Sequence, residues 1–139
     1  MPLLFRVQYL TMGPVLTVAE QVKRIPPGVR PTVQAARRTV RALAPKAREI
    51  AYQSQPPRSK SALWKIVRYS SEDEPVIGIG TFSTYATLYF YRGRELEDAG
   101  AKLEGSGKDM RFIRLHTPAD AVRPAVRRLV RRAFALEND

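Results

Sequence analysis

The chain has 139 residues, a length that suits one domain with its own hydrophobic core, and its 44% hydrophobic and 27% charged residues are ordinary for a globular protein. It has no cysteine, which excludes disulfides, thiolate metal sites and cysteine nucleophiles. The net charge of +11, from 24 basic and 13 acidic residues, favours contact with negatively charged partners such as nucleic acid.

Residues 1–29 are expected to form a poorly ordered arm in front of the domain. This segment is mildly apolar, but Arg6, Gln8 and the pair Gly13-Pro14 interrupt it, so it does not match a signal peptide. No apolar run in the chain approaches the roughly 20 residues that span a bilayer. We therefore expect a cytoplasmic protein without a membrane partner.

An amphipathic helix is predicted after the proline-rich segment that ends at Thr32, a suitable N-cap residue. Apolar residues then recur every three or four positions, with arginines between them. The apolar stripe consists of Val33, Ala36, Val40 and Leu43, and the arginines are Arg37, Arg38 and Arg41. Pro45 is expected to open a second short helix, over residues 45–53, which the pair Pro56-Pro57 ends.

Four antiparallel strands are predicted next. Residues 62–69, 76–82 and 84–93 are short apolar runs joined by brief turns, as in a meander, and residues 111–116 follow after a polar, glycine-rich crossover. Alternation within the third run predicts that Ala86, Leu88 and Phe90 face the core. The residues expected on the other face of the sheet are Tyr85, Thr87, Tyr89 and Tyr91.

The last element is predicted to be a helix with Pro124 in its first turn, where a proline does not break the hydrogen-bond ladder. Its buried stripe is Val126, Leu129, Val130, Ala133 and Phe134, and its outer face carries Arg127, Arg128, Arg131 and Arg132. The expected fold class is α+β: a two-layer sandwich in which an antiparallel sheet of about four strands packs against N- and C-terminal helices.

The stretch LEGSGKDMRFIRLH, residues 103–116, contains a Gly-Lys pair like that of a phosphate-binding loop. That loop also needs a glycine five residues before its last glycine and a Ser or Thr after the lysine, but Lys102 and Asp109 occupy these positions. Two interpretations stay open. The loop could bind an anion through Lys108, Arg111 and its amides, or Gly105 and Gly107 could supply positive φ angles for a tight turn.

The same stretch resembles the signature of the YdhG-like family of small bacterial domains, in which Leu-Glu-Gly-x-Gly-Lys precedes a basic residue and an apolar strand. Residues 44–52, 89–98 and 122–133 resemble further family segments in the same order. The resemblance covers about residues 30–136, which we expect to form a single YdhG-like domain. After Tyr52, the sequence QSQPPRSKS stands where the family usually has a glycine and a proline.

The resemblance implies a fold related to the frataxin-like sandwiches and, for part of the family, a role as an intracellular iron chaperone that would pass iron to acceptor proteins. Iron requires hard oxygen ligands, chiefly exposed carboxylates. The candidates are Glu72, Asp73 and Glu74 in the first hairpin turn, with Glu95, Glu97, Asp98 and Glu104 in the crossover. Alternatively, these carboxylates are simply solvated, and a chain of charge +11 attracts Fe²⁺ or Fe³⁺ poorly.

A basic module that binds nucleic acid or another polyanion is the second interpretation. Arginines neutralise phosphates, and exposed tyrosine rings stack with bases. The residues concerned are Arg127, Arg128, Arg131 and Arg132 for phosphates and Tyr85, Tyr89 and Tyr91 for bases. Alternatively, the arginines form a solvated face, and the tyrosines lie on a half-covered sheet face or in a homodimer interface.

The sequence gives no sign of an enzyme. His116 is the only histidine, it has no second histidine or cysteine with which to bind zinc, and it is interpreted as structural. No spacing suggests an activated nucleophile or a pair of catalytic carboxylates. The sequence therefore predicts a non-enzymatic binding domain, with iron and a polyanion as the two candidate ligands.

Overall fold

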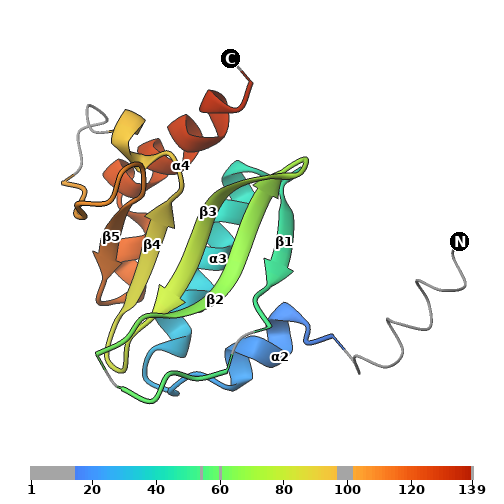
Figure 1. The fold of residues 1–139 in the computed structure, drawn as a ribbon, viewed down its shortest axis with the longest axis vertical. Helices are drawn as coiled ribbons and strands as arrows, with labels where there is room; N and C mark the ends of the chain where they lie inside the picture. Colours follow the sequence, from blue (N-terminus) through green and yellow to red (C-terminus); the bar gives the residue numbers. More distant parts are fainter. Residues whose placement is uncertain (1–14, 54, 60, 97–101, 139) are drawn as a thin grey trace, which may run out of the picture.

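The computed structural model describes residues 15–53, 55–59, 61–96 and 102–138, and in this part of the chain it shows an α+β fold of two layers (Figure 1). The helices are α2 (Val18–Lys23), α3 (Arg30–Leu43) and α4 (Pro124–Leu136), with two short 3-10 helices, η1 (Gly93–Leu96) and η2 (Pro118–Val122). The strands are β1 (Arg48–Ala51), β2 (Trp64–Ser71), β3 (Glu74–Thr81), β4 (Ala86–Phe90) and β5 (Arg111–Leu115).

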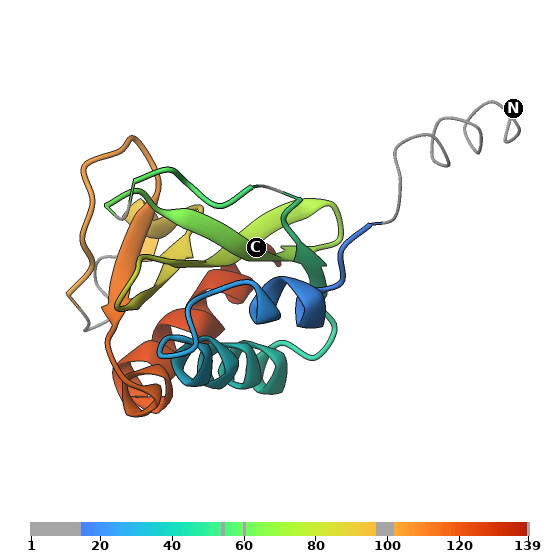
Figure 2. The same ribbon diagram turned by 90° about the horizontal axis from the view of Figure 1, so that it is seen from below.

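The strands form one antiparallel meander in the order β1-β2-β3-β4-β5. Figure 2 shows that α2, α3 and α4 all lie on the same face of this sheet. The predicted α+β class, with a sheet packed against N- and C-terminal helices, is therefore confirmed. None of the helices in the described segments is long and apolar enough to cross a membrane.

The sheet has one strand more than predicted, because part of the segment expected to be a short helix is strand β1. The chain leaves α3 at Ala44 in a non-helical conformation (φ −135°, ψ 68°), and Glu49 then pairs with Tyr69 of β2. A nine-residue segment between prolines is short for a stable helix. Pairing with the free edge of β2 gives its backbone groups partners, and this tertiary contact overrides the local preference.

The domain also begins earlier than expected, because residues 15–29 are not a loose arm. Thr17 caps α2: its hydroxyl accepts a hydrogen bond from the Glu20 amide at 3.1 Å, and its own amide donates to the Glu20 carboxylate at 2.9 Å. Behind this cap, the chain buries Val22, Ile25 and Val29 in the core. Residues 1–14 of the predicted arm lie outside the described residues.

Both longer helices bury most of the stripe that their sequence predicts, and Leu43 and Phe134 are partly buried. In α3, Val33, Ala36 and Val40 are buried, but the helix starts at Arg30, and the expected cap residue Thr32 lies inside it and is buried. Pro31 occupies the first turn, where its missing amide costs nothing. Pro124 likewise begins α4, as predicted, and the helix buries Val126, Leu129, Val130 and Ala133.

The face of the sheet away from the helices is partly covered. Cross-strand pairing places Arg68, Gly78, Tyr89 and Phe112 on this face, where the Tyr89 ring lies over Gly78. Every residue of β4 is buried, including Thr87 and Tyr89, so this strand has no open face. The chain between β1 and β2 crosses the same side of the sheet (Figure 2) and brings Leu63 over Gly80.

Candidate anion-binding surface

The outer side of the helical layer is rich in arginine. Both α3 and α4 turn their apolar stripes toward the sheet and pack against each other, so their remaining side chains face away from the core. We call this region the arginine surface, and it consists of Arg38, Arg41, Arg127, Arg128, Arg131 and Arg132. All six side chains reach solvent, with Arg127 the least exposed of them.

Most of these arginines form no ion pair, although the charge of Arg41 acts on Glu49, which lines the same pocket as Arg38 and Arg41. In the described part of the chain, no carboxylate forms an ion pair with Arg38, Arg41, Arg127, Arg131 or Arg132. Guanidinium groups that form no ion pair produce a positive potential that attracts negatively charged partners. The arginine surface is therefore a region to which a polyanion would be drawn.

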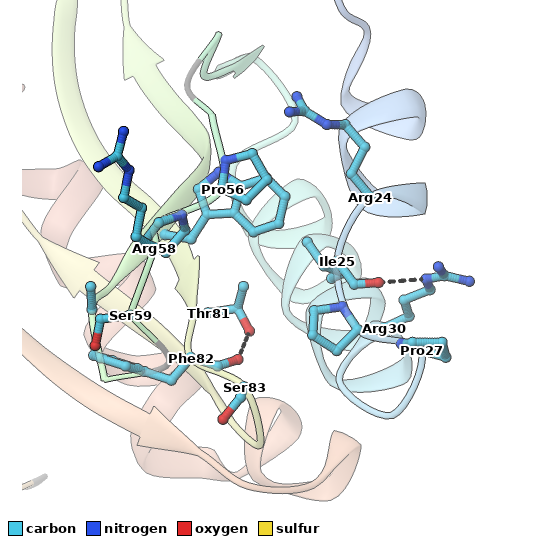
Figure 3. Close-up of a pocket in the computed structure, with 14 residues that line it drawn as sticks. Arg24, Ile25, Pro27, Arg30, Pro56, Arg58, Ser59, Thr81, Phe82 and Ser83 are labelled. Atoms are coloured by element: carbon cyan, nitrogen blue, oxygen red, sulfur yellow. Dashed lines mark hydrogen bonds between the residues drawn. The ribbon is translucent and has the colours of Figure 1, made fainter.

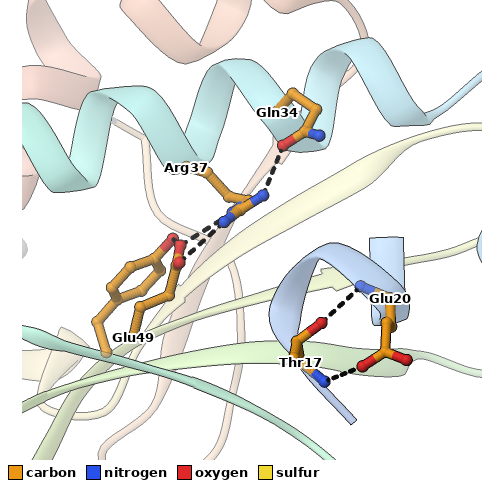
Figure 4. A network of polar contacts seen from close by, with 6 residues as sticks. Thr17, Glu20, Gln34, Arg37 and Glu49 are labelled. Carbon is orange, nitrogen blue, oxygen red and sulfur yellow. Dashed lines mark hydrogen bonds and ion pairs between the residues drawn. The ribbon is translucent and has the colours of Figure 1, made fainter. Parts of the chain in front are cut away.

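Arg37 also lies on α3, but it is held by the protein. Its guanidinium donates two hydrogen bonds of 2.9 Å to the carboxylate of Glu49, and a third, also of 2.9 Å, to the side-chain carbonyl of Gln34 (Figure 4). The hydroxyl of Tyr69 donates to the same carboxylate at 2.6 Å. Arg37 therefore joins α3 to the sheet and belongs to the fold, whereas its neighbour Arg38 faces solvent.

This network changes the pKa values of its members. Burial alone would raise the pKa of Glu49, but the hydrogen bonds from Arg37 and Tyr69 outweigh burial, and the pKa lies below its ordinary value of 4.5. Burial raises the pKa of the Tyr69 hydroxyl far above its usual range, and the bond to Glu49 acts in the same direction. At neutral pH the carboxylate is charged and the phenol is neutral, as the hydrogen bonds require.

The tyrosines predicted to lie on one face of the sheet contact other residues of the protein. Tyr89 is only 2% exposed, and the hydroxyl of Tyr91 shares a hydrogen bond with that of Tyr52. Tyr85 stacks on Phe82 with ring centroids 4.9 Å apart. The buried Tyr89 ring offers no face to a base, whereas Tyr85 and Tyr91 are half-buried, so the stacking platform that the sequence suggested stays a prediction.

Cations of the protein itself lie over these rings. Lys65 is 5.5 Å from the ring centroid of Tyr89, Arg68 is 5.6 Å from that of Tyr52, and Arg114 is 5.6 Å from that of Tyr85. Such cation–π contacts stabilise both partners and take the place that a ligand would need. The basic residues on this side of the sheet therefore contact rings of the protein itself and stabilise the fold.

The glycine motif is a structural loop. Gly105 has a φ of +121°, which confirms its predicted role, whereas Gly107 does not need a positive φ. Arg111 donates hydrogen bonds to the carbonyls of Gly107 at 2.6 Å and Met110 at 2.9 Å, so its guanidinium fixes the loop from inside. Lys108 is exposed. The structure therefore favours the tight-turn interpretation over anion binding.

The acidic residues are not gathered into a metal site. Glu72, Asp73 and Glu74 are all exposed around the two-residue turn between β2 and β3, and Asp73 is 3.9 Å from Arg48. In the crossover, Arg92 pairs with Glu95 at 2.7 Å and Arg114 with Glu104 at 3.3 Å, while Glu97 and Asp98 lie outside the described residues. Among the residues that the structure describes, no group of three or more His, Asp or Glu side chains could hold a metal ion.

His116 is exposed at the end of β5, and its ring lies 5.3 Å from that of Tyr85. Its backbone amide donates to the carboxylate of Asp120 at 2.8 Å, and the Thr117 amide does so at 3.2 Å. These bonds hold the pKa of Asp120 below its ordinary value of 3.8. The contacts agree with the structural role that the sequence suggested for His116.

Sequence reasoning placed Arg127, Arg128, Arg131 and Arg132 on the outer face of the closing helix, where the structure has them. It did not join Arg38 and Arg41 to this set. The signal was present, since both fall outside the apolar stripe of α3, but nothing in the sequence says that α3 and α4 lie side by side.

Comparisons with family models, with curated proteins and with solved structures found no match to this chain. The YdhG-like resemblance therefore remains a prediction that rests on the motif residues 103–116 and the three shorter segments.

Proposed function

We propose that the protein is a non-enzymatic binding module whose arginine surface binds a polyanion, with duplex nucleic acid as the ligand that fits best. The observation that supports the proposal is that Arg38, Arg127, Arg131 and Arg132 form no ion pair with a carboxylate of the described residues. Guanidinium groups form strong, often bidentate hydrogen bonds with phosphate oxygens. The proposed site of action is the cytoplasm.

The chemistry of the tyrosine-bearing sheet face and of the arginine surface favours a duplex over a single strand. Single-strand binding uses aromatic side chains on which bases stack. The tyrosines of the sheet are buried or paired, whereas the arginine surface contains cations and no aromatic ring. Such a surface would contact the phosphate backbone and have little sequence preference.

The iron-chaperone role that the resemblance implies has no supporting observation of this kind. The acidic turn at Glu72–Glu74 consists of separate, exposed carboxylates. A positively charged protein also lowers the local concentration of metal cations. We therefore do not propose iron as the ligand, and an anaerobic calorimetric titration with ferrous iron, with magnesium as control, would test that choice directly.

Nucleic-acid binding is tested by the fluorescence anisotropy of a labelled DNA duplex at several salt concentrations. If about four or five phosphates are neutralised, log K should fall with log [salt] with a slope of about −4. Reversing three charges of the surface, in the variant Arg127→Glu/Arg131→Glu/Arg132→Glu, should weaken binding by about a factor of 10 or more.

The matched control reverses three exposed charges elsewhere, in the variant Arg94→Glu/Lys102→Glu/Lys108→Glu, which has the same net charge. It should retain most of the affinity. Equal weakening by both variants would show that net charge alone attracts the duplex. Binding that does not depend on salt, or no binding at all, would refute the proposal.

A further inference from the structure

A pocket of about 450 Å³ lies away from the arginine surface, where the chain around α2 meets the ends of β2 and β3 (Figure 3). Its walls come from four parts of the chain: the turn between α2 and α3, the segment before β2, the start of β2 and the turn after β3. They consist of Arg24, Ile25, Pro26, Pro27, Arg30, Pro56, Pro57, Arg58, Ser59, Ala62, Trp64, Thr81, Phe82 and Ser83. The volume is within the range of sites that hold small molecules.

The pocket is cationic. Arg24, Arg30 and Arg58 line it, no carboxylate does, and none of the three arginines forms an ion pair in the described part of the chain. Three guanidinium groups around one cavity without a counter-charge create a strong local preference for an anion. A dianion such as a phosphate monoester suits three positive charges better than a single carboxylate does.

The three arginines are held to different degrees. Arg30 donates to the carbonyls of Ile25 at 3.1 Å and Lys23 at 2.8 Å, so it also fixes the turn between α2 and α3. Arg24 donates to the side-chain carbonyl of Gln21 at 2.8 Å. Arg58 is exposed and forms no hydrogen bond or ion pair with the described residues, so its guanidinium is available to a ligand.

The remaining wall is apolar and partly aromatic. Trp64 is 6% exposed, and its indole Nε1 is buried with no hydrogen-bond partner in the described part of the chain. Arg24 lies 5.4 Å from the Trp64 ring centroid, and Phe82 and four prolines complete the wall. Flat apolar walls favour a planar ring.

We propose that this pocket binds a small organic anion that carries both a phosphate group and a planar ring. Arg24 and Arg58 would contact the phosphate, and the ring would lie against the prolines, Phe82 and Trp64. Nucleoside monophosphates and simple aryl phosphates share this chemistry. The site is separate from the arginine surface, and the inference does not depend on the nucleic-acid proposal.

Trp64 is the only tryptophan in the chain, so intrinsic fluorescence reports on this pocket alone. Titration with adenosine monophosphate should give a saturable change, with N-acetyltryptophanamide as the optical control. Adenosine, which lacks the phosphate, and inorganic phosphate, which lacks the ring, should each bind at least about 10-fold more weakly. Phenyl phosphate distinguishes the two sources: an affinity equal to that of adenosine monophosphate indicates aryl phosphates in general, and weaker binding indicates a nucleotide.

Arg58→Gln is the decisive variant, because Arg58 supports no other contact of the fold. It should weaken the monophosphate by at least about 10-fold, the loss expected for one charge-assisted contact. Arg94→Gln, at an exposed arginine outside the pocket, should have no effect. The arginine-surface variant should retain monophosphate binding, so the two proposals can fail separately. An unsaturable signal, or equal affinity for inorganic phosphate alone, would overturn the proposal, as would full affinity in Arg58→Gln.

Discussion

Glu49 is the residue that connects α3 to the edge of the sheet. Its carboxylate accepts two hydrogen bonds from Arg37 and one from Tyr69, and its side chain is 17% exposed. The variant Glu49→Gln leaves the Arg37 guanidinium half-buried without a counter-charge. We expect it to lower the free energy of unfolding by about 1–3 kcal/mol at pH 7, measured by urea denaturation.

The pH dependence of stability should change in the same variant. Because folding lowers the pKa of Glu49 below 4.5, its contribution is present above about pH 4.5 and is lost as the pH falls through the folded-state value. The stability gap between wild type and Glu49→Gln should therefore narrow in acid. In the control Glu104→Gln, whose carboxylate forms an exposed pair with Arg114, stability should change by at most about 1 kcal/mol. A gap that stays constant with pH would contradict this assignment.

Gly78 has no space for a side chain, because a Cβ atom there would overlap the ring of Tyr89. That ring is buried and cannot turn aside, so Gly78→Ala should cost about 1–3 kcal/mol of stability. Thermal unfolding measures this loss. Gly28→Ala is the matched control, since no atom lies within 4 Å of the added Cβ, and it should leave Tm nearly unchanged. An unchanged Tm in Gly78→Ala would mean that Tyr89 does not pack there.

Local rules predicted some of these residues and not others. Pro124 and Gly105 were predicted because each is explained by the backbone conformation of its own segment. The partner of Arg37 was not, because Glu49 is 12 residues away, on a strand that the sequence pattern assigned to a helix. Contacts between layers depend on the fold, and a single sequence does not reveal them.

At the level of elements, the long periodic segments were predicted well and the short ones were not. The stripes of α3 and α4 and the strands β2 to β5 follow their hydrophobic periodicity. Strand β1 has four residues, too few for a readable alternation, and its identity comes from pairing with β2. Helix α2 has six residues and was hidden in a segment whose composition suggested an arm.

The contribution of the chain around α2 to the domain can be measured. Ile25 is 1% exposed in the core, so Ile25→Ala should lower the free energy of unfolding by about 2–5 kcal/mol. Val15→Ala is the control, because that side chain is 53% exposed, and it should have an effect of about 0.5 kcal/mol or less. Equal stability of wild type and Ile25→Ala would show that this segment does not belong to the core.

Across the whole molecule, the arginines fall into two groups: those that pair with carboxylates of the protein and those that do not. Arg37, Arg92 and Arg114 pair with carboxylates and hold elements together. Other arginines form no ion pair in the described part of the chain: Arg38, Arg127, Arg131 and Arg132 on the helices, and Arg24, Arg30 and Arg58 at the pocket. Composition showed the excess of charge, but only the fold shows where it remains unpaired.

The candidate sites were predictable to a smaller extent than the fold. The outer arginines of α4 followed from helical periodicity, but the burial of Tyr89 within the expected aromatic platform did not follow from the strand pattern. The pocket could not be anticipated, since its walls come from segments as distant as Arg24, Arg58 and Phe82. These segments form one pocket because the chain between β1 and β2 contributes Arg58 and its neighbours to the wall.

The loop of the glycine motif has a consequence for how the protein behaves at high concentration. Backbone groups of Glu104 and Phe112 bond to each other at 2.8 and 2.9 Å along the outer edge of β5. An uncovered edge strand recruits strands from other molecules, and a short or charged edge discourages it. The opposite edge, β1, is four residues long and exposes Arg48. The stretch that most resembles a ligand loop thus protects the protein against edge-to-edge aggregation.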